Sequence, residues 1–269
     1  MNRIENIFNK LKKENIKALI PYVCCGYPNL EFTEKLVLRL AESGADLIEL
    51  GVPYSDPVAD GPTIQRAAVG ALENGVTLEQ ILSMACRLRE RTEIPLIVMT
   101  YFNTVYVKGI EQFIKMAAAS GIDGLIIPDL PLEESEELKT MANKYGLDLI
   151  LLIAPTSTPE RIKKISEASR GFIYCVSVSG VTGARTNVLA NLGEFLTTIR
   201  QETGLPLAVG FGISNPETAR LAACEADGVI VGSALIEKIE ESMGEEKSAE
   251  KALEAAGYFV LKLKKAITG

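Results

Sequence analysis

The feature that most constrains the fold of this chain is an alternation of short apolar runs with longer amphipathic segments, repeated from one end to the other. The runs have the length of strands and are apolar almost throughout, as expected of parallel strands buried on both faces. The segments between them, such as Glu31–Glu42 and Pro159–Ala168, place apolar residues at helical spacing. We predict strands at residues 17–24, 46–51, 95–101, 123–128, 147–153, 171–177, 206–210 and 227–231.

A short signature ending in Asp recurs just before four of these runs. The four segments are Ser43–Asp46, Ser120–Asp123, Tyr145–Asp148 and Glu225–Asp227, and the first three contain a glycine. Glycine suits the position after a helix end, where the backbone is left-handed. One turn used repeatedly indicates one β/α unit used repeatedly, and eight units in 269 residues are typical of a (β/α)8 barrel. A doubly wound open sheet is the alternative, but its Gly-rich G-x-G-x-x-G turn is missing.

Three elements are additional to the eight units. Residues 2–14 have a helical pattern and could close the bottom of the barrel. Pro53–Gly61 is an extended loop after the second strand, and a second irregular loop runs from Ser179 to about Val188 after the sixth. Both loops follow strands, so both belong to the C-terminal face where barrel active sites form. With no linker or break in composition, we predict a single α/β TIM-barrel domain over residues 1–269.

Composition excludes several kinds of chemistry. The net charge of −7 disfavours a nucleic-acid or anionic-membrane partner. The absence of histidine excludes Ser-His-Asp and Cys-His catalysis and His-ligated zinc. The five cysteines have no metal-binding spacing, and no apolar run reaches the roughly 18 residues that span a bilayer. We expect no metal, reduced thiols and a cytoplasmic location.

Two carboxylates after the second strand are candidate catalytic groups. Glu49 lies near the carboxyl end of that strand, where a buried acid must be protonated, paired or functional. Asp60 lies in the following loop, whose geometry Pro53 and Pro57 restrict. The pair could supply general acid–base catalysis and electrostatic stabilisation. The alternatives are a structural Glu49 satisfied by its neighbours and an Asp60 that serves a turn or caps a helix.

The run from Ile48 to Gly61 resembles the signature of the tryptophan synthase α subunit family over fourteen consecutive residues. The resemblance extends over the whole chain. Further matching segments are Pro21–Val23, Met99–Asn103, Pro128–Pro131, Ser179–Gly183, Gly210–Ile213 and Val231–Ala234. The family fold is a (β/α)8 barrel, in agreement with the prediction from the pattern.

The resemblance implies a carbon–carbon lyase that cleaves indole-3-glycerol phosphate to indole and glyceraldehyde 3-phosphate by a retro-aldol reaction. It implies that Glu49 performs the proton transfers, and that Asp60 accepts a hydrogen bond from the indole N–H. Tyr174 is implied to place the substrate near both carboxylates, although a tyrosine in a strand is more often part of a core. Glu49 would need a pKa raised toward neutrality, which partial burial supplies.

The two ends of the substrate need different surroundings. Gly212, Gly232 and Ser233 follow the seventh and eighth strands, where barrel loops and a helix N-terminus commonly bind phosphate. By resemblance, Gly183 adds a backbone donor, and Thr182 belongs to a lid over Val181–Asn187 that closes onto Asp60. The apolar indole pocket implied by the family is formed by Tyr22, Met99, Ile126 and Phe211. Tyr22 stands where the family usually has Phe, and Met99 and Ile126 where it usually has Leu.

The family also implies a partner. Indole would pass to a pyridoxal-phosphate β subunit of an α2β2 complex, facing Pro53–Pro57 and Asp129–Pro131, and this chain would need no cofactor of its own. The alternatives are a stand-alone lyase that releases free indole, a non-catalytic activator of a β subunit, and a different phosphate-binding barrel isomerase. Loss of turnover in Glu49→Gln would exclude the activator.

Overall fold

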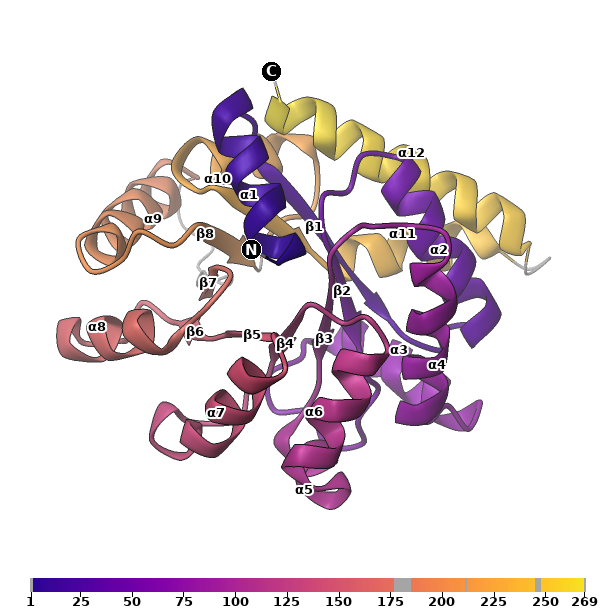
Figure 1. Ribbon diagram of the computed structural model, residues 1–269. Helices are drawn as coiled ribbons and strands as arrows, with labels where there is room; N and C mark the ends of the chain where they lie inside the picture. Colours follow the sequence, from indigo (N-terminus) through magenta and orange to yellow (C-terminus); the bar gives the residue numbers. More distant parts are fainter. Residues whose placement is uncertain (1, 177–184, 211, 245–247, 269) are drawn as a thin grey trace.

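The computed structural model describes residues 2–176, 185–210, 212–244 and 248–268 as strands wrapped by helices (Figure 1). The strands are β1 Ala18–Cys24, β2 Ile48–Gly51, β3 Leu96–Met99, β4 Gly124–Ile126, β5 Asp148–Ile150, β6 Leu152–Ile153, β7 Ile173–Val176, β8 Leu207–Gly210 and β9 Gly228–Val231. The helices are α1 Arg3–Glu14, α2 Leu30–Glu42, α3 Pro62–Glu73, α4 Leu78–Arg89, α5 Phe102–Lys108, α6 Ile110–Ala119, α7 Glu136–Lys144, α8 Pro159–Ala168, α9 Arg185–Arg200, α10 Pro216–Glu225, α11 Ser233–Met243 and α12 Ala249–Thr268, and a 3-10 turn covers Leu132–Glu134.

The strands form a parallel barrel. Their order is β5-β4-β3-β2-β1-β9-β8-β7-β6, and every pair is parallel. The two ends of this order, β5 and β6, are consecutive in the chain and separated only by Leu151. The Leu151 carbonyl accepts a hydrogen bond from the Tyr174 N–H at 3.1 Å. The run 147–153 is therefore one strand that pairs with β4 in its first half and β7 in its second, and the eight-stranded prediction is confirmed.

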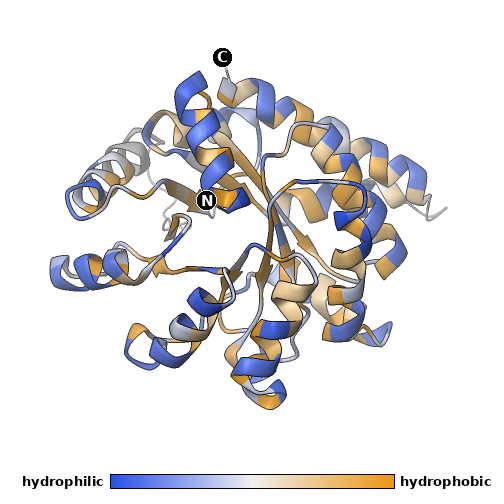
Figure 2. Cartoon of the chain, viewed as in Figure 1, coloured by the Kyte–Doolittle hydropathy of each residue, from blue (hydrophilic) through white to orange (hydrophobic). Residues whose placement is uncertain are grey.

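Strand alternation separates two hydrophobic clusters. Side chains such as Ile20, Leu47, Ile97 and Ile230 fill the barrel interior, whereas Leu19, Ile48 and Val98 face the helices and join the larger outer core. Figure 2 shows the consequence, with apolar strands inside and helices whose polar residues lie on the outside.

The predicted N-terminal helix closes the barrel bottom. In α1, Ile4, Phe8 and Leu11 are buried in the same cluster as the barrel interior, and the Phe8 ring lies 5.6 Å from the Phe172 ring. Figure 1 shows α1 over the end of the barrel, inside the ring of the other helices.

The recurring signature before the strands has a second function besides the helix end. Gly44, Gly121 and Gly146 have the expected positive φ. In three of the four signatures, including Glu225–Asp227, which has no glycine, the Asp accepts a hydrogen bond from one of the first residues of the neighbouring strand. The N–H of Leu19 donates to Asp46 at 2.7 Å, that of Leu96 to Asp123 at 2.8 Å and that of Leu207 to Asp227 at 2.9 Å. In each case the Asp N–H donates in return to the same leucine carbonyl, so the carboxylate fixes strand register at the barrel bottom.

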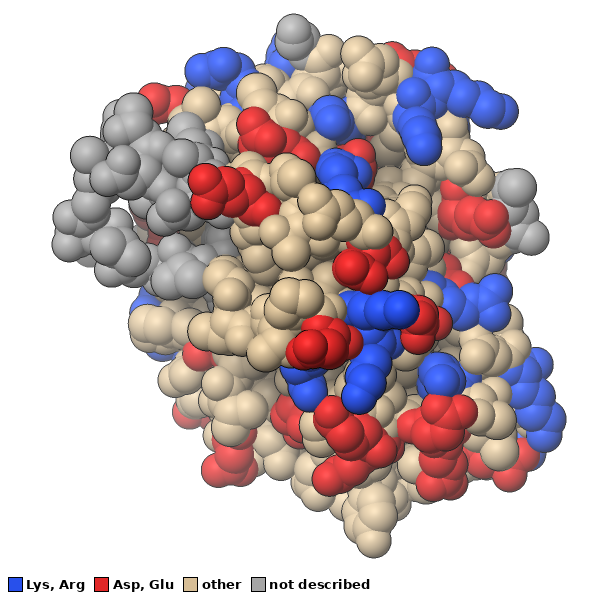
Figure 3. Space-filling view, turned by 90° about the vertical axis from the view of Figure 1, so that its left-hand side faces the viewer, with Lys and Arg blue, Asp and Glu red and all other residues tan. Residues whose placement is uncertain are grey.

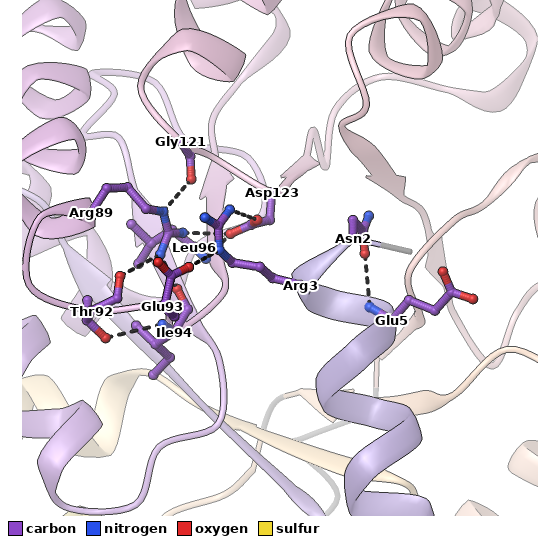
Figure 4. Close-up of polar contacts among 10 residues, drawn as sticks. All are labelled: Asn2, Arg3, Glu5, Arg89, Thr92, Glu93, Ile94, Leu96, Gly121 and Asp123. Atoms are coloured by element: carbon purple, nitrogen blue, oxygen red, sulfur yellow. Dashed lines mark hydrogen bonds and ion pairs between the residues drawn. The ribbon is translucent and has the colours of Figure 1, made fainter.

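The Asp of each of the four signatures also has a cationic partner. Lys264 lies 2.6 Å from Asp46, Arg200 2.9 Å from Asp227 and Arg170 3.6 Å from Asp148. Figure 4 shows the most elaborate case, in which buried Asp123 contacts Arg89 at 2.6 Å and Arg3 of α1 at 3.1 Å. Arg3 also contacts Glu93, so the N-terminal helix is tied to the barrel by charge as well as by apolar packing.

Two loop predictions have different outcomes. Residues 52–61 have no regular structure, as predicted, and they are followed by two helices, α3 and α4, before β3. The loop predicted after the sixth strand lies partly outside the described residues, and α9 begins at Arg185, three residues before the predicted end of that loop. The earlier start is a correction at the loop boundary.

None of the helices among the described residues is long and apolar enough to cross a membrane. On the face shown in Figure 3, acidic and basic side chains of the described residues are intermixed instead of forming a field of one sign.

Candidate active site at the carboxyl end of the barrel

Glu49 projects into the barrel from β2. In the parallel register it lies between Tyr22 of β1 and Ile97 of β3, and its side chain points to the same interior as Ile97. The residue is 1% exposed, and neither carboxylate oxygen has a hydrogen-bond partner among the described residues. Burial, and then the charge of Asp60, raise the pKa of Glu49 to about 8. Glu49 is therefore mostly protonated at neutral pH and can donate a proton.

Asp60 is held over the barrel mouth by Tyr101, which lies just beyond the carboxyl end of β3. Burial raises the pKa of the Asp60 carboxyl, and a hydrogen bond with the Tyr101 hydroxyl opposes that rise. The residue does not cap α3: Gly61 is the N-cap, with no side-chain bond, and Pro62 is the first helical residue. The helix-cap alternative for Asp60 is therefore wrong, and its carboxylate is available to a ligand.

Tyr101 is the site residue to which sequence reasoning assigned no role. Its phenolic oxygen accepts a hydrogen bond from the Ala59 N–H at 3.1 Å, and its ring stacks on Tyr54 with centroids 5.0 Å apart. Tyr101 thus binds both the backbone and the side chain of the loop that carries Asp60. The sequence feature that could have identified Tyr101 is its position just beyond the third strand, at the same end of the barrel as Glu49.

Two tyrosines flank the carboxylates inside the barrel. Tyr22 and Tyr174 are buried, and each ring lies across the glycine that ends the next strand. A Cβ on Gly51 would lie 2.1 Å from the Tyr22 hydroxyl oxygen, and one on Gly210 would lie 2.3 Å from that of Tyr174. Burial raises the pKa of both phenols, and the charges of Glu49 and Asp60 raise it further. Both phenols therefore stay neutral hydrogen-bonding groups.

The apolar positions lie on adjoining strand ends. Met99 ends β3 and pairs in register with Ile126, which ends β4. Ile126 is fully buried in the barrel interior, while Met99 is half-buried and packs against it. Of the predicted indole pocket, Phe211 lies outside the described residues.

The predicted phosphate positions adjoin the same mouth. β8 pairs with β9, and β9 pairs with β1, which carries Tyr22. Gly232 precedes α11 as its N-cap and Ser233 is its first residue, so the first-turn N–H groups of this helix face the carboxyl end of the barrel. Gly212 has a φ of +77°, which favours glycine. Thr182 and Gly183 lie outside the described residues.

The structure thus places Glu49, Asp60, Tyr22 and Tyr174 within mutual electrostatic influence. No cluster of three or more metal-ligating side chains occurs among the described residues. A cavity of about 540 Å³ lies at the other end of the barrel beside α1, lined by residues that include Phe8, Asp148 and Arg170. Barrel enzymes place their chemistry at the carboxyl ends of the strands, so the mouth around Glu49 is the candidate site.

Comparisons with known proteins show what the chain is similar to. The family model of the tryptophan synthase alpha chain matches residues 8–268. The tryptophan synthase alpha chain of Geotalea uraniireducens is 51% identical over 264 residues, covering 98% of this chain and 97% of the relative. That of Thermoanaerobacter sp. is 48% identical over 267 residues, covering 99% and 100%. The crystal structure of tryptophan synthase subunit alpha from Legionella pneumophila superposes with a TM-score of 0.92 at 39% identity, covering 99% of this chain and 98% of that one.

Proposed function

The chain belongs to the tryptophan synthase alpha chain family, and we propose that Glu49 and Asp60 carry out its chemistry. The protein is the lyase subunit of tryptophan synthase: it cleaves indole-3-glycerol phosphate to indole and glyceraldehyde 3-phosphate. The assignment of this chemistry to Glu49 and Asp60 rests on one observation: the Glu49 carboxyl is buried beside the loop of Asp60, has no hydrogen-bond partner among the described residues, and has a raised pKa.

Glu49 acts first as an acid. With a pKa of about 8 it holds a proton at neutral pH and delivers it to C3 of the indole ring, leaving positive charge at the ring nitrogen. The resulting carboxylate then removes the proton of the hydroxyl next to the bond to be broken. The carbon–carbon bond breaks, its electron pair returns to the indole, the hydroxyl carbon becomes the aldehyde, and Glu49 is again protonated.

Asp60 stabilises the cation formed in between. Its carboxylate accepts a hydrogen bond from the indole N–H, and the attraction grows as the ring nitrogen becomes positive. Tyr101 supports this role because it bonds to Asp60 and to the Ala59 N–H, which fixes the loop before substrate arrives.

The remaining predicted residues bind the two ends of the substrate. The backbone at Gly183, Gly212 and Gly232, with the Ser233 hydroxyl, would bind the phosphate. Tyr22, Met99, Ile126 and Phe211 would surround the indole, and Tyr174 would place the substrate. Thr182 would contact Asp60 when the lid closes and excludes water.

We further propose a β-subunit partner in an α2β2 complex, which holds the pyridoxal phosphate and receives indole. The support is three exposed apolar side chains on segments that follow β2 and β3: Val58, in the loop that carries Asp60, and Tyr106 and Val107 on α5, which are 80%, 70% and 78% exposed. Asp129 accepts a hydrogen bond at 2.8 Å from the Phe102 N–H at the start of α5. All five cysteines are unpaired, which supports a cytoplasmic location.

The proposal is tested by indole release from indole-3-glycerol phosphate, with and without a tryptophan synthase β subunit. Because the chain has no tryptophan, its background in an indole fluorescence assay is low. We expect slow release by the chain alone, a large increase with the β subunit and near-complete loss in Glu49→Gln. Fast release without the β subunit would indicate the stand-alone lyase instead, and unchanged release in Glu49→Gln would refute the role of Glu49.

A further inference from the structure

The phenol of Tyr22 lies next to Glu49 on the inner wall of the barrel. The two residues are partners in the β1–β2 register, and both point to the interior. The Tyr22 ring crosses from β1 over Gly51, which is two residues beyond Glu49 on the same face of β2. Its hydroxyl is therefore on the Glu49 side of the mouth, and only the missing side chain of Gly51 allows it to be there.

Glu49 lacks a donor for the charged half of its cycle. As a neutral acid it loses less by the lack of partners, but after protonating the indole it is a buried carboxylate with no hydrogen bond from any described residue. A buried carboxylate needs hydrogen-bond donors to offset the loss of water. A hydrogen bond to a charged oxygen is also stronger than one to a neutral oxygen.

Among the described residues, few groups that face Glu49 can donate a hydrogen bond. On β3, its neighbours Ile97 and Met99 are apolar. Asp60 is another acid and is bonded to Tyr101. The charge of Glu49 also acts on Tyr174, but the Tyr174 hydroxyl lies over Gly210, on the β8 side of the barrel. Tyr22 is the phenol in register with Glu49 on the adjacent strand, and it stays neutral because burial holds its pKa well above the usual value.

We propose that the Tyr22 hydroxyl donates a hydrogen bond to the ionised Glu49 carboxylate, and that Tyr22 is therefore a positioning residue for the proton transfers. This rests on the proposed role of Glu49. The bond would form by rotation of the flexible Glu49 side chain toward the phenol of its register partner. No proton leaves Tyr22: the hydroxyl stabilises the charged form of Glu49, which lowers the pKa of that carboxyl and makes it easier for Glu49 to give its proton to the indole.

The test is Tyr22→Phe, which removes one oxygen and keeps the ring. A charge-assisted hydrogen bond corresponds to a pKa change of about one unit, and so to about a tenfold effect. We expect the pKa of Glu49 to rise by about one unit, the alkaline limb of the kcat profile to move up with it, and kcat at neutral pH to fall about tenfold. Carbon-13 NMR of the labelled glutamate carboxyls follows the titration, with the Glu49 signal identified by its loss in Glu49→Gln.

The matched control is Tyr27→Phe. It removes a phenol that donates to Glu240 on α11, outside the site, at 3.0 Å. We expect this variant to leave the Glu49 titration and kcat unchanged. An unchanged Glu49 pKa in folded Tyr22→Phe would overturn the inference, even if kcat or KM fell, because a packing role alone does not move that titration. The NMR titration needs no turnover, so its result stands apart from the fate of the proposed function.

Discussion

Replacing Glu49 by Gln should stabilise the protein while it abolishes activity, and the gain should depend on pH. The pKa of Glu49 is about 8 in the folded chain, against an ordinary value of 4.5. The native state therefore binds this proton more tightly than the unfolded chain does. By linkage, the free energy of unfolding of the wild type falls as the pH rises from 4.5 to 8.

The magnitude follows from the same difference in pKa. At 1.36 kcal/mol per pKa unit, the full loss above pH 8 is about 5 kcal/mol, of which about 3 kcal/mol has accrued by pH 7. Glu49→Gln cannot ionise, so it escapes this loss. Its amide fits the same space, although it places a polar NH2 where the acid had a proton.

The assay is urea unfolding of wild type and Glu49→Gln at a series of pH values from 5 to 9. We expect the difference in unfolding free energy to grow by about 2.5 kcal/mol between pH 5 and pH 7 and to level off above pH 8. Glu93→Gln, which alters an exposed surface acid, serves as the control and should show no such rise. A difference that stays constant across this pH range would refute the assignment of a raised pKa to Glu49, whatever the variant's activity.

Three further perturbations have defined outcomes. Tyr101→Phe removes the hydroxyl that bonds to Asp60 and Ala59, and should lower kcat about tenfold in the indole-release assay, with a smaller change in KM. Asp123→Asn should lower the free energy of unfolding in urea by about 3 kcal/mol, because it leaves Arg89 buried without its counter-ion. Asp227→Asn should lower it by no more than about 1 kcal/mol, because Asp227 and its partner Arg200 are both more exposed. Val107→Asp should weaken binding of a β subunit in calorimetry at least tenfold without changing basal indole release, since it places a charge at an exposed apolar position of α5.

The fold was predictable from the sequence because its determinants are local and repeated. Apolar runs of strand length, helical spacing between them and a glycine after the helix end each specify one unit, and the units close by pairing with their neighbours. What the pattern missed was the carboxylate of the same signature. The bond from Asp123 to the Leu96 N–H joins residues 27 positions apart, and no periodicity within one segment reports such a contact.

The candidate site was predictable to a different degree. A charged residue in an apolar strand, as at Glu49, is visible in sequence because its burial conflicts with its charge. Asp60 was singled out by its proline-restricted loop, but whether its carboxylate caps α3 or faces the barrel mouth depended on Gly61 taking the cap position. The role of Tyr101 could not be predicted, because a tyrosine just after a strand is common. Its contact with the loop that carries Asp60 is visible only in the structure.

The two ends of the barrel resolve the same physical problem in opposite ways. At the bottom, Asp123 is buried and fully compensated by two arginines and a backbone N–H, so its burial stabilises the register of the strands. At the mouth, Glu49 is buried equally deeply and left without a partner among the described residues, so its burial raises its pKa instead. The uncompensated carboxyl costs stability at neutral pH, and a fold can tolerate it only because other elements, such as the Asp123 network, fix the backbone independently. Adding a permanent cation beside Glu49 would stabilise the fold at alkaline pH and remove the proton that the reaction needs. The missing partner is therefore the functional feature of the site, and a neutral donor such as Tyr22 is the kind of neighbour that preserves it.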